Sequence, residues 1–312
     1  MPHIPSLSLG LPNFAADDPG GWDHLLARAE AADEAGIDRL VVSDHVVFGE
    51  HLEEYGKPEV GGTAGGKQPT GPDGHWLEPL TVLSVVAGRT KRVRLATGIL
   101  IAALRRPIVL AKTAATLDVL SGGRLDLGVG VGWQREEYEA AGLPFAGRGR
   151  LLDETLELCQ TVWRDTDATL TVGDTTVEHI HQMPKPRQAG GVPIWVSGTL
   201  NPRVVARVAR FGSGWIPWGP DAIDPAAGIS RLRDALDEAG RGDVDLQVTG
   251  TLPVVKGADG ALDLARTMAG VPPLVAAGIT DLRARVSVPA ERAAAVDLLT
   301  PLVAAFREAT RA

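Results

Sequence analysis

Residues 121–133 read SGGRLDLGVGVGW, and this stretch carries the pattern that decides the fold class. The glycines Gly122-Gly123 end the helical pattern that precedes them. Leu125–Val129 then forms a short, largely apolar run, which is typical of a strand buried on both faces of a sheet. Gly130-Val131-Gly132 follows the run directly. A helix end, a buried strand and a glycine-rich strand end in this order indicate one unit of a parallel α/β fold.

Seven further apolar runs alternate with segments of helical periodicity along the chain. Eight such units predict an α/β fold of the (β/α)8 TIM-barrel type. An open doubly wound sheet remains the alternative, because periodicity alone does not show closure. The expected strands are Leu7–Leu11, Leu40–Val42, Val93–Ile101, Leu125–Val129, Ile194–Val196, Trp215-Ile216, Leu246–Val254 and Thr280–Val286.

Two segments depart from this rhythm. Within residues 166–192, Thr169–Val172 and Thr176–Ile180 flank Gly173-Asp174, which predicts an insertion hairpin after the fourth βα unit. Residues 46–75 are too long for an ordinary βα connection and are rich in glycine. We interpret them as a lid, with plain disorder as the alternative. We expect residues 1–312 to form one domain.

The composition of the chain limits the classes of protein to which it can belong. The chain has 312 residues, 44% of them hydrophobic, and a formal net charge of −8, which indicates neither a nucleic-acid partner nor a membrane surface. No signal peptide and no transmembrane run is visible. The single cysteine, Cys159, lies among apolar residues of an expected helix and indicates a buried thiol in a reducing compartment. These features predict a cytoplasmic enzyme.

An active site of this fold is expected just after the strands. The second strand ends in Ser43-Asp44-His45, where Asp44 and His45 must point to opposite faces. We expect one of the two to face the barrel mouth and the other to brace the structure. His45 is the candidate for proton transfer, because imidazole titrates near neutrality; a hydrogen-bonded core histidine is the alternative.

Two other strand ends are candidate ligand sites. Gly130 and Gly132 do not have the GxGxxG spacing, and either a flat ligand close to the backbone or tight core packing explains them. Ser197–Leu200 precedes Asn201-Pro202, a helix cap, which predicts a phosphate site or else an ordinary turn. His179 and His181 have no third ligand at a sensible spacing, so we expect no metal.

The ordered set of motifs resembles the bacterial luciferase-like monooxygenase superfamily, in particular its branch that uses the deazaflavin coenzyme F420. The resemblance covers almost the whole chain and is dense between residues 36 and 218. The residues that carry it are Gly36–Asp38 with Ser43–His45, Trp76–Leu80, Leu95–Leu100, Ala111–Asp118, Ser121–Trp133, Pro184–Pro186 with Pro193–Val196, and Gly212–Trp215.

The resemblance implies roles for particular residues. Gly98-Ile99 would carry a non-prolyl cis peptide against which the cofactor ring packs. Val131-Gly132 would follow the cofactor side chain, Gly198–Leu200 would hold its phosphate, and His45 would be the catalytic residue. The cofactor-binding residues expected in all are Asp44, His45, Thr97, Gly98, Ile99, Gly130, Val131, Gly132, Ser197, Gly198, Thr199, Leu200 and Trp215.

Two departures bear on the substrate. A sugar-phosphate dehydrogenase of this group has an acidic residue where this chain has Trp133, and a tryptophan where it has Gly49. A more apolar organic substrate therefore fits better. The resemblance implies an F420-dependent oxidoreductase, and relatives are commonly homodimers. The alternatives are an FMN-dependent monooxygenase, a non-catalytic flavin-binding barrel, and a phosphate-binding lyase or isomerase. Schiff-base chemistry is disfavoured, because Lys112 and Lys185 do not stand at strand ends.

Overall fold

Eight parallel strands close into a barrel in the computed structural model, which describes residues 4–311. Their order is β1-β12-β11-β10-β9-β6-β5-β3, and β1 pairs with both β12 and β3. This closure confirms the barrel and excludes the open sheet. The strands are β1 (Ser6–Gly10), β3 (Arg39–Val42), β5 (Arg94–Thr97), β6 (Leu125–Val129), β9 (Ile194–Gly198), β10 (Gly214–Pro217), β11 (Gln247–Leu252) and β12 (Asp281–Ala284).

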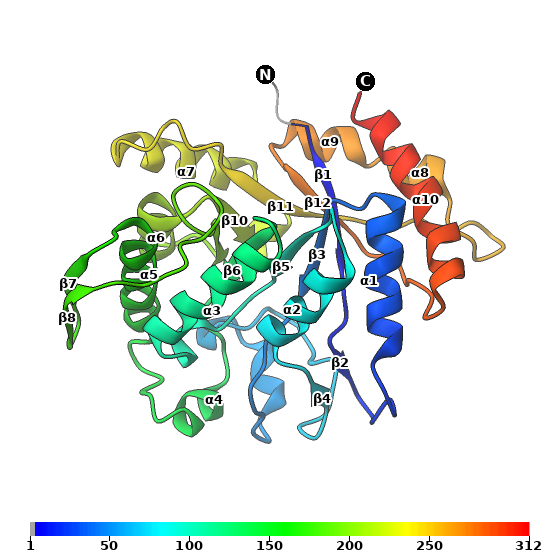
Figure 1. The fold of residues 1–312 in the computed structure, drawn as a ribbon. Helices are drawn as coiled ribbons and strands as arrows, with labels where there is room; N and C mark the ends of the chain where they lie inside the picture. Colours follow the sequence, from blue (N-terminus) through cyan, green and yellow to red (C-terminus); the bar gives the residue numbers. More distant parts are fainter. Residues whose placement is uncertain (1–3, 312) are drawn as a thin grey trace.

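Helices surround the barrel (Figure 1). Asn201 caps one of them, as expected, by accepting hydrogen bonds from the amides of Arg203 and Val204. The terminal helix begins at Arg292, where Glu291 caps it by accepting from the amides of Ala293 and Ala294. The helices are α1 (Asp23–Ala35), α2 (Pro79–Arg89), α3 (Pro107–Leu120), α4 (Arg135–Ala140), α5 (Arg148–Arg164), α6 (Pro202–Phe211), α7 (Ala226–Glu238), α8 (Leu264–Met268), α9 (Val271–Ala276) and α10 (Arg292–Ala309).

Several shorter elements complete the fold. The antiparallel hairpin of β7 (Ala168–Val172) and β8 (Thr175–Ile180) confirms the expected insertion. Another small sheet pairs β2 (Phe14–Ala15) with β4 (His75–Trp76). Short 3-10 turns are η1 (Leu52–Gly56), η2 (Pro58–Val60), η3 (Ala102–Leu104) and η4 (Gly219–Ala222). Within residues 4–311 no helix has both the length and the apolar character needed to span a bilayer.

The layer between strands and helices is apolar, as alternation along the strands requires. Leu7 and Leu9 of β1, for example, are 0% and 2% exposed. Cys159 of α5 is fully buried in this layer, as expected, and burial raises the pKa of its thiol to about 12. The thiol is therefore a packing group and not a nucleophile.

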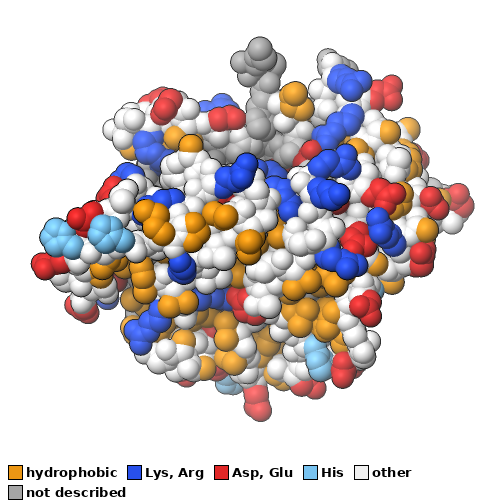
Figure 2. Space-filling model, viewed as in Figure 1, with side chains coloured by type: hydrophobic (Ala, Val, Ile, Leu, Met, Phe, Trp, Pro, Cys, Tyr) orange, Lys and Arg blue, Asp and Glu red, His pale blue; other side chains and the backbone are white. Residues whose placement is uncertain are grey.

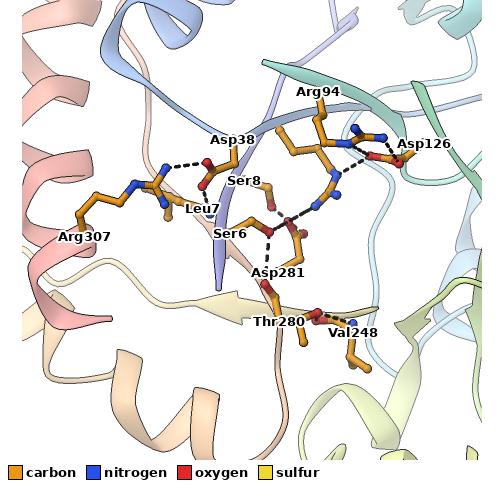
Figure 3. A network of polar contacts seen from close by, with 11 residues as sticks. Ser6, Leu7, Ser8, Asp38, Arg94, Asp126, Val248, Thr280, Asp281 and Arg307 are labelled. Carbon is orange, nitrogen blue, oxygen red and sulfur yellow. Dashed lines mark hydrogen bonds and ion pairs between the residues drawn. The ribbon is translucent and has the colours of Figure 1, made fainter. Parts of the chain in front are cut away.

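The barrel interior, by contrast, is charged (Figure 3). Arg39 of β3 donates to Asp126 of β6 over 3.0 Å and also to Asp281 of β12. Arg94 of β5 binds both oxygens of Asp126, at 2.7 and 2.6 Å. Ser8 of β1 donates to Asp281 over 2.9 Å. Five strands are thus joined through two aspartates, and two arginines balance the charge of these aspartates.

Replacing Arg39 tests how much the fold depends on this network. Arg39→Met should lower the free energy of unfolding by about 3–5 kcal/mol, because Asp126 and Asp281 lose a buried partner. Urea denaturation followed by circular dichroism measures the change. Arg89→Met, which breaks an exposed pair with Glu30, should cost no more than about 1 kcal/mol. Equal effects of the two substitutions would contradict a central role for Arg39.

Candidate active site at the barrel mouth

The loops that follow the strands gather at one end of the barrel, which is the lower end in Figure 1. Residues 46–75 lie at this mouth and are held at three places. The Trp218 indole donates to Gly62 O over 3.0 Å, and Arg148 donates to Val60 O over 2.8 Å. Gln68 Nε2 lies 3.3 Å from His45 Nε2. The segment therefore contacts loops that follow β3, β6 and β10.

His45 is held between two polar groups at this mouth. Its Nδ1 lies 3.2 Å from Glu137 Oε1, and the same oxygen accepts from the amide of Val46 over 2.8 Å. A carboxylate can only accept a hydrogen bond, so Nδ1 carries the hydrogen and donates a hydrogen bond to Glu137. Nε2 is then unprotonated and accepts from the Gln68 amide. His45 is thereby held as the tautomer whose Nε2 lone pair accepts from Gln68.

Aromatic side chains surround the imidazole. The ring centroids of Phe48, Trp76 and Trp133 lie 4.5, 4.8 and 6.0 Å from that of His45. Tyr55 meets Trp133 edge-on at 5.7 Å. Burial raises the pKa of the Tyr55 phenol. The mouth is therefore a largely apolar enclosure in which His45 is the polar group best placed for proton transfer.

Asp44 takes the bracing position. Its side chain has no exposed surface, accepts from the amide of Ile101 over 2.8 Å and binds Arg105 through both oxygens. Trp215 is also fully buried, and its indole donates to Gly198 O from beneath the Ser197–Leu200 turn. Thr97 is 1% exposed and donates to Gly128 O. In this structure Asp44, Trp215 and Thr97 are buried, and they affect the mouth only by supporting neighbouring residues.

The strand ends of β5 and β6 come together beside the mouth. The peptide bond Gly98-Ile99 is cis, as the resemblance implies. A Cβ on Gly130 would lie 2.9 Å from Ile99, and Gly132 has φ +66° and faces Ile101. Packing therefore already explains Gly130 and Gly132. Gly98, Ile99, Val131 and Gly132 nonetheless keep partial exposure, so a planar group has backbone to lie against.

The Ser197–Leu200 turn, where we expect a phosphate, binds a carboxylate side chain of the protein itself. The amide of Leu200 donates to Asp221 Oδ2 over 2.6 Å, and Thr199 Oγ1 donates to Trp218 O. The Asn201 side chain already uses the amides of Arg203 and Val204. Ser197 and Gly198 are partly exposed and Thr199 is exposed. The turn can receive a phosphate at Leu200 N only after Asp221 leaves.

A planar cofactor thus fits one end of the site better than the other. The mouth offers apolar walls and a histidine, which suit a ring and its substrate, whereas Asp221 occupies the phosphate end. The sequence did not indicate Glu137, Gln68, Asp221 or Arg283 as parts of the site. On the exposed hairpin, His179 pairs with Asp167 and lies away from the mouth.

The sequence profile of the luciferase-like monooxygenases matches residues 9–299. The chain belongs to this family. An uncharacterized protein of Mycobacterium tuberculosis is 33% identical over 165 residues, which are 53% of this chain and 58% of that protein. The phthiodiolone/phenolphthiodiolone dimycocerosates ketoreductase of Mycobacterium kansasii is 30% identical over 253 residues, covering 77% of this chain and 65% of the ketoreductase.

Each of these two matches spans less than two thirds of the relative's own length. Among solved structures, an F420-dependent secondary alcohol dehydrogenase in complex with an F420-acetone adduct superimposes with a TM-score of 0.72 at 17% identity. That alignment covers 97% of this chain and 99% of the dehydrogenase, and it shows the shared barrel fold.

Removing Glu137 tests the support of His45. Glu137→Ala should lower the free energy of unfolding by about 1–3 kcal/mol, because His45 Nδ1 and the Val46 amide both lose their acceptor. Glu139→Ala is the matched control, since Glu139 is exposed on the same helix. Chemical denaturation compares the two. A Glu137→Ala protein as stable as the control would show that the pair does not hold this strand end.

Proposed function

We propose that the chain is an F420-dependent oxidoreductase that transfers a hydride between the deazaflavin and an organic substrate. The observation that carries this proposal is His45, which Glu137 and Gln68 hold inside an aromatic mouth as the tautomer with an unprotonated Nε2. The family match and the dehydrogenase and ketoreductase relatives support it. The deazaflavin, when bound, would accept or donate the hydride.

The side chains of the mouth would handle the proton that accompanies the hydride. Oxidation of an alcohol to a ketone releases a hydride from carbon and a proton from the hydroxyl. His45 Nε2 would accept this proton, and Glu137 would stabilise the resulting imidazolium through Nδ1. In the reverse direction the same imidazolium would return the proton to the carbonyl oxygen. Gln68 must first yield its contact with Nε2 to the substrate.

The cofactor residues follow from this proposal. Gly98, Ile99, Gly130, Val131 and Gly132 would lie along the ring and its side chain. Ser197, Gly198, Thr199 and Leu200 would bind the phosphate once Asp221 is displaced. Residues 46–75 would act as the lid over the site, since they already contact three strand ends. An FMN-dependent monooxygenase is the second candidate, because the matched family is that of the luciferase-like monooxygenases and FMN has the same kind of planar ring.

Cofactor binding separates the two candidates. Purified protein titrated with F420 and with FMN, followed by fluorescence, should bind F420 preferentially. FMN binding without F420 binding at tens of micromolar would overturn the proposal. His45→Ala should lower turnover by about 100- to 10,000-fold and leave F420 affinity almost unchanged, because the residue supplies proton transfer. Equal turnover in variant and wild type would remove His45 from the mechanism.

A second copy of this chain is the proposed partner. Exposed apolar side chains gather on α2 and α3 and next to them, on the face that Figure 2 shows. On α3, Val109 and Leu120 are 59% and 73% exposed and lie three turns apart on one side of the helix. Val85 of α2, Ile108 of α3 and Met183 are also more than 40% exposed. Such a patch is typical of a subunit interface.

Light scattering after gel filtration tests the dimer. The wild type should elute with twice the chain mass of 32.8 kDa. Val109→Glu with Leu120→Glu should shift the protein to one chain mass, because the interface would then bury unpaired carboxylates. Arg150→Glu, on the outer side of α5, should leave the mass unchanged. A monomeric wild type at micromolar concentration would contradict the interface.

A further inference from the structure

Within residues 4–311, Arg283 is a cation inside the barrel that makes no direct salt bridge. It follows Asp281 by two positions on β12, so both side chains point inward. Arg39 and Arg94 already balance Asp126 and Asp281. Among residues 4–311 the Arg283 guanidinium has neither a hydrogen bond nor an ion pair, and its Nε is buried without a partner. Burial lowers the pKa of Arg283, the charge of Asp281 opposes this effect, and repulsion from Arg39 and Arg285 adds to it.

The free end of Arg283 faces the mouth. Its two Nη atoms lie 3.4 and 3.5 Å from the position that a Cβ would take on Gly98, directly after β5. Beneath the guanidinium, a cavity of about 10 Å³ has Thr249 and Ile216 in its wall. That cavity holds one water at most. Arg283 is partly exposed, and its guanidinium lies beside Gly98.

Arg285 extends the same inward face toward the solvent. It is exposed and forms no salt bridge with any other residue of 4–311. Its charge opposes the effect of burial on the pKa of the Tyr55 phenol. Arg283 and Arg285 thus place two positive charges at the end of β12. Holding a buried cation unpaired is costly, which favours an anionic ligand as the missing partner.

We propose that Arg283, assisted by Arg285, determines substrate specificity by binding the carboxylate of an organic acid in the mouth. The inference rests on the proposed function, because it assigns the substrate class of that same site. Guanidinium binds carboxylate through two parallel hydrogen bonds. Tyr55 meets Trp133 and Trp218 edge-on, and aromatic walls of this kind suit an apolar body. The substrate is therefore an organic acid whose reacting carbon belongs to an apolar body.

Binding to the cofactor-free protein tests this inference independently of turnover. Acetate, hexanoate and phenylacetate are titrated by calorimetry against hexanamide and phenylacetamide, which have the same shapes without the charge. At least one of the two larger acids should bind, and its amide should bind at least about 10-fold more weakly. Arg283→Met should lower the affinity for the acid about 10- to 100-fold and leave the amide unchanged.

Controls separate charge at the mouth from charge elsewhere. Arg233→Met removes an exposed cation of α7 and should change no affinity. Arg283→Lys should keep part of the affinity. Without ligand, Arg283→Met should melt at least as high as the wild type, because it removes an unpaired buried charge. If that variant fails to fold, the wild type alone decides: the acid, and not its amide, should raise the melting temperature.

Three results would overturn the inference. The first is that no acid binds below about 10 mM, the range of very weak contacts. The second is that Arg283→Met weakens F420 binding and leaves acid binding unchanged, which would assign the guanidinium to the cofactor. The third is that inorganic phosphate binds as tightly as the acids. If F420 does not bind while acid binding depends on Arg283, the proposed function fails and the anion site stands.

Discussion

Arg39 holds two aspartates inside a barrel whose interior is otherwise closed to water, and the arrangement of the polar interior depends on it. The centre of an eight-stranded barrel has to be filled by side chains. Here charged side chains fill the layer farther from the mouth, and the Trp195 ring lies 4.4 Å from the Arg39 guanidinium. Arg39 and Arg94 balance the charges of Asp126 and Asp281. Arg283, two positions after Asp281 on β12, therefore makes no direct salt bridge with either aspartate within the described residues.

At the end of β3, two neighbouring residues have different roles: one supports the structure and the other faces the mouth. Asp44 and His45 are neighbours in sequence, but one side chain joins Ile101 and Arg105 while the other enters the mouth. Each is anchored by an element far along the chain, Asp44 by the loop after β5 and His45 by α4. The strand end is therefore rigid at the point where the imidazole must keep one tautomer. Such preorganisation is what a proton-transfer group requires.

The sequence predicted the frame better than the site. All eight strands, the hairpin and the Asn201 cap follow from local periodicity and capping chemistry, which neighbouring residues determine. The division of labour between Asp44 and His45 was also predictable from strand alternation, although not which side chain faces the mouth. Asp221 and Glu137 were missed, because each acts through a contact with a residue 21 or 92 positions away. No local pattern encodes such distances.

The pairing of β1 with β12 also determines when the barrel can form. Leu7 lies beside Leu282, so the first and last strands complete the ring together. A chain that emerges from the ribosome can pair β1 with β3 early, but the other edge of β1 waits until almost the whole sequence has been made. Asp281 arrives with that last strand, which means that the Arg39 network is completed only at closure. Nascent chains of this protein therefore carry an open strand edge for most of their synthesis.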